Sequence, residues 1–100
     1  MKTNNKRPKT HELNTSAKSY ENAQTGLYLL KSAILDVIEA NPEGIKNSEL
    51  TRLLGLESDF NGNQRNYLTY SVLGLLIKEN RVYRDELTKK FRLKFSQKKL

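Results

Sequence analysis

The side chains able to do acid–base, nucleophilic or metal chemistry are few and scattered in this sequence. There is no cysteine and one histidine, His11, so a thiolate metal site and a thiol nucleophile are excluded and His11 has no second histidine to share a metal. The acidic pair Asp85-Glu86 and the separate Asp59 lack the converging acids and lysine that a nuclease needs. No glycine-rich phosphate loop and no nucleophile–base motif is present. We therefore expect no catalysis, no metal and no cofactor.

Polar side chains between residues 59 and 80 suggest a different use. The apolar spacing predicts a helix that starts between Asp59 and Asn63 and ends near Asn80. Its expected buried stripe is Leu68, Val72, Leu75 and Leu76. At about 100° per residue, the opposite face holds Asn63, Asn66, Tyr67, Tyr70 and Gly74.

Short polar groups at the start of a helix suit contact with base edges in a DNA groove. Asparagine makes two hydrogen bonds to adenine, and tyrosine bonds a phosphate or packs on a thymine methyl. The alternative is an ordinary solvated face, but such faces usually carry Glu and Lys, and this one carries neither before Lys78. Ser71, beside the expected core stripe, is assigned no role. The expected base-reading set is Asn63, Asn66, Tyr67 and Tyr70.

A second group of side chains suits phosphate binding. From residue 90 the sequence alternates with period two, which puts Lys90, Arg92 and Lys94 on one face of a predicted strand, about 7 Å apart. Phosphates along one DNA strand have a similar spacing. The alternative is charge that protects an exposed edge strand from aggregation, and both can hold. The expected phosphate-binding set is Gln64, Arg65, Arg84, Lys89, Lys90, Arg92 and Lys94.

The charge is unevenly distributed along the 100 residues, whose formal net charge is +7. Residues 1–24 carry five basic and two acidic side chains, residues 25–60 three and six, and residues 61–100 ten and three. Such a basic C-terminal part implies an acidic partner, with nucleic acid first and an anionic membrane second. No run approaches the ~20 apolar residues that span a bilayer. We expect a soluble single domain without membrane association, in the cytoplasm or on the nucleoid.

The first elements follow from the apolar pattern. Residues 1–24 have few apolar side chains, so we expect a basic, flexible N-terminal arm, with a short helix capped at 14–16 as the alternative. A helix is predicted from Thr25 to Ala40, and Asn41-Pro42 ends it, because the residue before proline avoids the helical conformation. Its expected buried stripe is Leu27, Leu30, Ile34, Val37 and Ile38.

Two further helices are predicted from their ends. Asn47 or Ser48 is expected to cap a second helix, which Gly55 closes in the left-handed conformation. Asn61 and Gln64 have the spacing of a capping box at the start of the third helix. The acids Glu57 and Asp59 just before it are expected to stabilise that helix through its dipole.

The C-terminal part predicts a hairpin. Val82 to Arg84 is the expected partner of a strand in which Phe91, Leu93 and Phe95 share the apolar face, and Asp85 to Lys89 is the loop. Ile45, a strand of one or two residues, is expected to pair with this hairpin. Residues 96–100 are expected to form a basic tail.

In this order of elements the chain resembles the winged helix-turn-helix family. The segment Ile45–Leu56, IKNSELTRLLGL, is similar to the second helix of that family, and Asn66–Val82, NYLTYSVLGLLIKENRV, resembles its third helix running into the first wing strand. The resemblance covers residues 25–95 and extends to the small winged-helix domains associated with restriction–modification systems. It implies an α+β, mainly α fold that binds double-stranded DNA, as a transcriptional regulator or DNA-targeting module. The third helix, about residues 61–79, would lie in the major groove and the wing on phosphates.

Several alternatives stay open at the level of the sequence. The chain departs from the family pattern in its long turn at Glu57 to Gly62 and its short wing, and some winged domains bind proteins or RNA. A protein-interaction domain is the second hypothesis, with Tyr67, Tyr70 and Ile77 as an aromatic and apolar contact. An RNA-binding or ribosome-associated protein is the third. The basic arm is either a minor-groove contact or a solubilising tail. A homodimer would use Tyr28, Leu29 and Leu35, which alternatively cover the arm.

Overall fold

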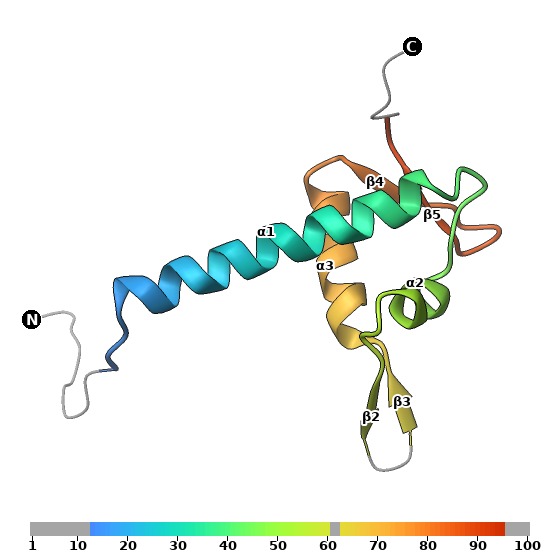
Figure 1. The fold of residues 1–100 in the computed structure, drawn as a ribbon. Coiled ribbons are helices and arrows are strands. Elements are labelled where there is room, and N and C mark those ends of the chain that lie inside the picture. The colour runs from blue at the N-terminus through green and yellow to red at the C-terminus, as the bar shows by residue number, and fades with distance from the viewer. Residues whose placement is uncertain (1–12, 61–62, 96–100) are drawn as a thin grey trace, which may run out of the picture.

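The computed structural model of the protein describes residues 13–60 and 63–95. This part is α+β and mainly helical, with three helices and a C-terminal antiparallel hairpin, as expected from the sequence. Residues 1–12 of the expected arm, the expected capping residue Asn61 and the expected tail 96–100 lie outside it. The elements are α1 (Ala17–Glu39), α2 (Asn47–Leu53), β2 (Ser58–Phe60), β3 (Asn63–Arg65), α3 (Tyr67–Lys78), β4 (Val82–Arg84) and β5 (Phe91–Leu93) (Figure 1).

Helix α1 begins at Ala17 instead of Thr25, so part of the expected flexible arm is helical. Ser16 is the N-cap, and its hydroxyl accepts a hydrogen bond from the backbone N–H of Ser19 at 3.0 Å. A helix already nucleated by its packed half extends without a new nucleation cost, so the polar composition of residues 17–24 does not prevent them from being helical. At the other end the prediction is confirmed, because the helix stops before Asn41, whose Nδ2 donates to the carbonyl of Val37 at 2.8 Å.

Helix α2 is short and closed at both ends. The Glu49 carboxylate accepts a hydrogen bond from the Lys46 N–H at 2.9 Å. Gly55 has a φ of +68°, and the N–H of Leu56 donates to the carbonyl of Thr51 at 2.9 Å, which is the Schellman pattern of helix closure. The closing role of Gly55 is thus confirmed, whereas Asn47 is the first helical residue and not the cap.

A hairpin, β2–β3, stands where the sequence predicted the start of the third helix. Its strands are antiparallel, with Ser58 opposite Arg65 and Phe60 opposite Asn63. The intervening sequence Asn61-Gly62 is the favoured composition of a two-residue hairpin loop, and it competes with the capping-box spacing at the same place. Residues 63–65 are therefore in a strand and α3 starts at Tyr67, so Glu57 and Asp59 do not directly precede this helix in the sequence as expected.

The core lies where the three helices and the C-terminal hairpin meet. Three residues of α3 differ from expectation, because Leu73 is buried whereas Leu68 and Leu75, which were expected in the core, are 51% and 39% exposed. The buried face of α3 is therefore rotated toward Thr69 and Leu73. The fully or nearly buried apolar residues are Ile34, Leu35, Ile38, Ile45, Leu50, Val72, Leu73, Leu76, Val82 and Phe91.

The C-terminal hairpin and its pairing with Ile45 agree with the prediction. Val82 lies opposite Leu93 and Arg84 opposite Phe91. Ile45 and Phe91 exchange two backbone hydrogen bonds of 3.1 and 2.8 Å, which tie the segment before α2 to β5. The hairpin thus completes the core through the buried Val82 and Phe91 and the partly buried Leu93.

Candidate nucleic-acid interface

A chain of hydrogen bonds between α2 and α3 fixes how α3 is presented. The buried hydroxyls of Thr51 and Thr69 lie 2.5 Å apart, and Thr69 Oγ1 lies 2.8 Å from Asn47 Oδ1. Asn47 Nδ2 donates to the backbone carbonyl of Asn66 at 3.1 Å. Thr51 Oγ1 also donates to the backbone carbonyl of Asn47 at 2.7 Å, so Asn47 accepts from both threonine hydroxyls through its two oxygens. These bonds cross from one helix to the other and hold the N-terminus of α3 in place.

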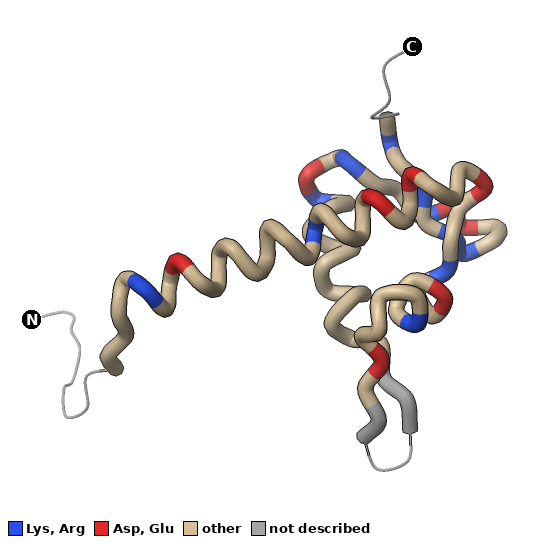
Figure 2. Tube along the Cα trace, viewed as in Figure 1, with Lys and Arg blue, Asp and Glu red and all other residues tan. Residues whose placement is uncertain are grey.

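The outward face of α3 is uncharged over most of its length. Tyr67, Ser71, Gly74 and Lys78 follow one another at helical spacing and are exposed, opposite the buried Thr69 and Leu73 face. Tyr70 and Ile77 flank them on one side, and Leu68 and Leu75 on the other. From Tyr67 to Ile77 the helix carries no charged residue, and Figure 2 shows it in tan over most of its length.

The structure brings together only part of the expected base-reading set. Tyr67 and Tyr70 are 68% and 53% exposed on the first turns of α3. Asn66 occupies the N-cap position and is partly buried, and its Oδ1 is buried without a hydrogen-bond partner among the described residues. Asn63 lies on β3 and not on α3. Ser71 was missed, although its place four residues after Tyr67 would have shown it on the same face.

The expected phosphate-binding residues fall into two separate places. Gln64 and Arg65 are on β3, whereas Arg84 is on β4 and the other four are on or beside β5. Lys90 is half-buried and Lys94 exposed, and neither forms an ion pair within the described part of the chain. Residues 81–95 carry six basic and two acidic side chains, and Figure 2 shows the basic ones gathered around this hairpin.

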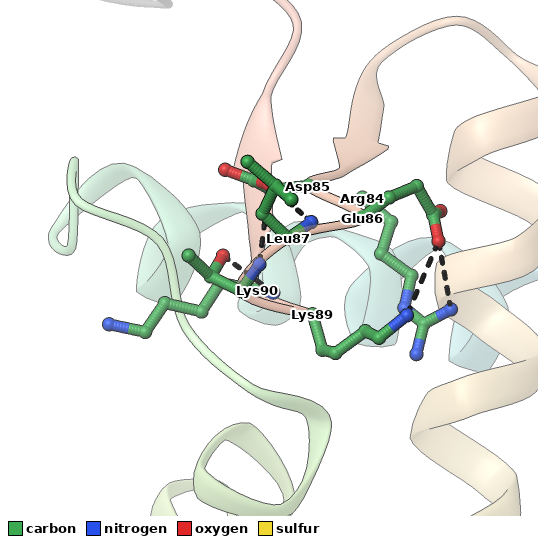
Figure 3. A network of polar contacts seen from close by, with 7 residues as sticks. Arg84, Asp85, Glu86, Leu87, Lys89 and Lys90 are labelled. Atoms are coloured by element: carbon green, nitrogen blue, oxygen red, sulfur yellow. Dashed lines mark hydrogen bonds and ion pairs between the residues drawn. The ribbon is translucent and has the colours of Figure 1, made fainter.

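Two acids of the hairpin loop pair with three of those cations. Glu86 Oε1 lies 3.9 Å from Arg84 Nη1 and 3.6 Å from Lys89 Nζ (Figure 3). Asp85 Oδ2 lies 3.7 Å from Arg92 Nη2. The Arg84 guanidinium also lies 5.9 Å from the centre of the Phe91 ring, a cation–π contact. Part of the positive charge is therefore compensated within the hairpin itself.

Asp85 also builds the loop. Its Oδ1 accepts hydrogen bonds from the backbone N–H groups of Leu87 at 2.9 Å and Thr88 at 3.4 Å, which fold the turn seen in Figure 3. These two bonds, with Arg92 nearby, hold the pKa of Asp85 below its ordinary value. The loop closes at Lys89, which has a φ of +66°.

The turn between α1 and α2 packs directly on the hairpin. Gly44 has a φ of +102°, and a Cβ placed on it would lie 2.8 Å from the Cβ of Lys90 and 3.1 Å from Arg92 Nε. This close approach requires glycine and fixes the stems of Lys90 and Arg92 against the body.

An ion pair joins α1 to the residue that follows the last turn of α3. Lys31 Nζ lies 2.5 Å from Glu79 Oε2, and Arg81 Nη1 lies 3.8 Å from Glu79 Oε1. The Lys31 hydrogen bond is the main cause that holds the pKa of Glu79 below its ordinary value. The negative charge of Glu79, next to the last turn of α3, is thereby compensated by two basic side chains.

Within residues 13–60 and 63–95 no group of three or more His, Asp or Glu side chains is placed to hold a metal ion. No helix in this described part is long and apolar enough to cross a membrane. Comparison with protein-family models, with curated proteins and with solved structures gives no match for this chain.

Proposed function

We propose that this protein is a winged helix-turn-helix module that binds double-stranded DNA. The order of three helices and a basic hairpin, with a strand residue before α2 paired to that hairpin, supports the winged-helix assignment. In this proposal α3 enters the major groove and the β4–β5 hairpin lies on phosphates. The module serves as a transcriptional regulator or as the DNA-targeting part of a larger assembly.

One observation carries the proposal most directly. The exposed face of α3 has no acidic side chain and no long charged stem before Lys78, while the adjoining hairpin is strongly basic. Tyr67, Tyr70 and Ser71 then supply hydroxyls for phosphates or base edges, and Gly74 leaves room for close approach. Lys90 and Lys94, which are free of ion pairs among the described residues, supply the phosphate contacts.

The test is selection from a randomised duplex DNA pool at near-physiological salt, followed by fluorescence anisotropy on the selected sequences. We expect a short enriched motif and an affinity that falls steeply with salt. Ser71→Ala should weaken binding to the motif only, whereas Lys90→Ala should weaken all duplexes alike and reduce the salt slope by about one. No retention of duplex DNA, or a clear preference for RNA in competition, would overturn the proposal.

A second function is favoured by a specific observation, the apolar character of α3. Tyr67, Leu68, Tyr70, Leu75 and Ile77 are all more than a third exposed, and no arginine or lysine accompanies them before Lys78. Such a surface suits a protein partner, for which tyrosines are frequent hot spots. Binding of a protein partner that is insensitive to salt, together with the absence of DNA binding, would favour this second function.

A further inference from the structure

The N-terminal half of α1 projects from the body of the protein (Figure 1). Every residue from Ala17 to Gly26 is exposed, whereas the second half of the helix packs on the core. The radius of gyration is 17.9 Å, well above the ~13 Å typical of a compact 100-residue domain. We call the segment Ala17–Gly26 the α1 extension.

The sequence of the α1 extension is poorly suited to stand alone as a helix. Ser19, Asn22 and Thr25 are weak helix formers, and Gly26 costs about 1 kcal/mol relative to alanine. Most helical stability in proteins comes from packing of one apolar face, and the extension has none within the monomer. A helix of this composition that is exposed on all sides therefore points to a partner.

An apolar stripe continues along the extension beyond the part that the monomer buries. Leu27, Leu30 and Ile34 face the core at spacings of three and four residues. The same spacings carried toward the N-terminus reach Ala23 and Tyr20, and Tyr20 is 66% exposed. The stripe therefore gives the extension an apolar side that suits contact with another apolar surface, and the described part of the monomer has no such surface beside Tyr20 and Ala23.

Such a surface exists at the base of the extension. An open groove of 410 Å³ lies between α1, the end of α2 and the start of α3. Gly26, Leu29 and Leu30 form its α1 side. Leu54, Leu56 and Leu68 form the other side, and the exposure of Leu68, unexpected from the sequence, is part of it.

The segments of this chain outside the described residues do not suit the groove. Residues 1–12 contain Met1 as their one large apolar side chain, and residues 96–100 contain Leu100 as theirs. Charge does not oppose a second copy at this place, because Lys18 and Glu21 are the charged residues between Ala17 and Leu30 and cancel each other. The basic hairpin, in contrast, would repel its copy.

We propose that two copies of this chain pair through their α1 helices, with the extension of each seated in the groove of the other. The helices run antiparallel and cross near Gly26, where the missing side chain permits close contact. A two-fold axis at this crossing brings Tyr20 of each copy over the groove that contains Leu68 of its partner. This interface uses Leu68 at the edge of α3 but none of the α3 and hairpin residues proposed to contact DNA, so dimer formation can be tested separately from DNA binding.

The first test is sedimentation velocity over a wide concentration range, without nucleic acid. We expect a dimer, and Tyr20→Glu should raise its dissociation constant by roughly tenfold or more, because a charge would enter an apolar groove. Tyr28→Glu is the matched control, since Tyr28 is equally exposed on α1 but points away from the groove. A monomer at all concentrations, or equal effects of the two substitutions, would overturn the proposal.

A second test uses the absence of cysteine in this chain. Gly26 and Gly74 are both exposed helical glycines with open space around them, so Gly26→Cys and Gly74→Cys are a matched pair. Mild oxidation should link Gly26→Cys into disulfide-bonded dimers and leave Gly74→Cys largely as monomeric chains. The reverse result would place the interface on α3 and refute the α1 pairing.

Discussion

Two buried threonines decide the orientation of the helix that we propose to contact DNA. Thr51 and Thr69 are fully buried, and their hydroxyls join α2 to α3 through Asn47. A buried hydroxyl without a partner costs more than a surface hydrogen bond returns, so each member of this group depends on the others. The Oδ1 of Asn66, whose backbone carbonyl accepts from Asn47, is buried without a hydrogen-bond partner among the described residues.

Thr69→Val should lower the free energy of unfolding by about 1–3 kcal/mol, because it removes the donor to Asn47 Oδ1 and the contact with the Thr51 hydroxyl at nearly constant volume, while Thr51 keeps its bond to the Asn47 carbonyl. Adding Thr51→Val should then cost much less than it does alone, since the two hydroxyls act together. Urea denaturation of the single and double variants measures this coupling. Thr25→Val, at an exposed site on α1, should stay within about 0.5 kcal/mol. Additive effects of the two buried substitutions would argue against the connected arrangement.

Asp85 gives the hairpin loop a dependence on pH. Its ordinary pKa is 3.8, and its pKa in the folded protein is lower. A lowered pKa contributes stability that is present above the unfolded value and is lost as the pH falls through the folded value. Asp85→Asn keeps an acceptor for the Leu87 and Thr88 N–H groups but removes the titration. We therefore expect the free energy of unfolding to fall below about pH 4 more steeply in the wild type than in the variant. Identical pH profiles in chemical denaturation would exclude this role.

Among the elements, those defined by local signals are predictable from the sequence, and those defined by distant contacts are not. Asn41-Pro42, Gly55 and the period-two pattern near Phe91 each act within a few residues, and the structure has the expected ends there. Apolar residues occur at most positions of α3, so periodicity alone cannot fix its buried face. That face depends on Thr69 meeting Thr51, which a sequence pattern does not show.

The two remaining differences between the expected and the observed elements have local causes. At Asn61-Gly62 a hairpin signal and a capping signal overlap, and the hairpin prevails. At Ser16 the cap was considered only as an alternative to a flexible arm. For the candidate site, Tyr67 and Tyr70 were found because both the expected and the observed buried face of α3 leave them exposed. Ser71 was missed because the expected stripe was centred on the wrong residues.

The contact between the α1–α2 turn and the hairpin predicts opposite effects at two glycines. Gly44→Ala should destabilise the protein by about 1–3 kcal/mol, because its positive φ and the 2.8 Å approach to Lys90 leave no room for a methyl group. Gly74→Ala, in open space on α3, should stabilise it by about 0.5–1 kcal/mol. Thermal unfolding followed by circular dichroism compares the two. A neutral Gly44→Ala would mean that the turn does not pack on the hairpin as described.

For the whole molecule, the distribution of charge matters more than the net value of +7. The basic residues concentrate around the hairpin, but Glu86 and Asp85 form ion pairs with three of them. The face proposed for DNA therefore combines a neutral helix with a partly compensated basic hairpin. The affinity for DNA in such an arrangement depends on how many basic side chains leave their acidic partners and contact phosphates.

Glu86→Gln should strengthen binding to all duplex DNA alike, because it frees Arg84 and Lys89 at no cost to the core. The salt slope of log affinity should become steeper by about one or two. Anisotropy titrations at several salt concentrations measure both quantities. Glu21→Gln, on the α1 extension, makes the same change in net charge away from the hairpin and should have a smaller effect. Equal effects of the two would show that net charge alone governs binding.

If two copies pair along the α1 extension, the length of α1 determines the distance between their two α3 helices. A helix advances 1.5 Å per residue, so the stretch from Gly26 to the core-anchored Ile34 sets how far apart the two α3 helices stand. The number of helical residues in this stretch would then determine the spacing of the two half-sites on DNA. Inserting one residue there would turn the body of each copy by about 100° relative to the paired extensions, whereas inserting seven would nearly restore the orientation at a longer spacing.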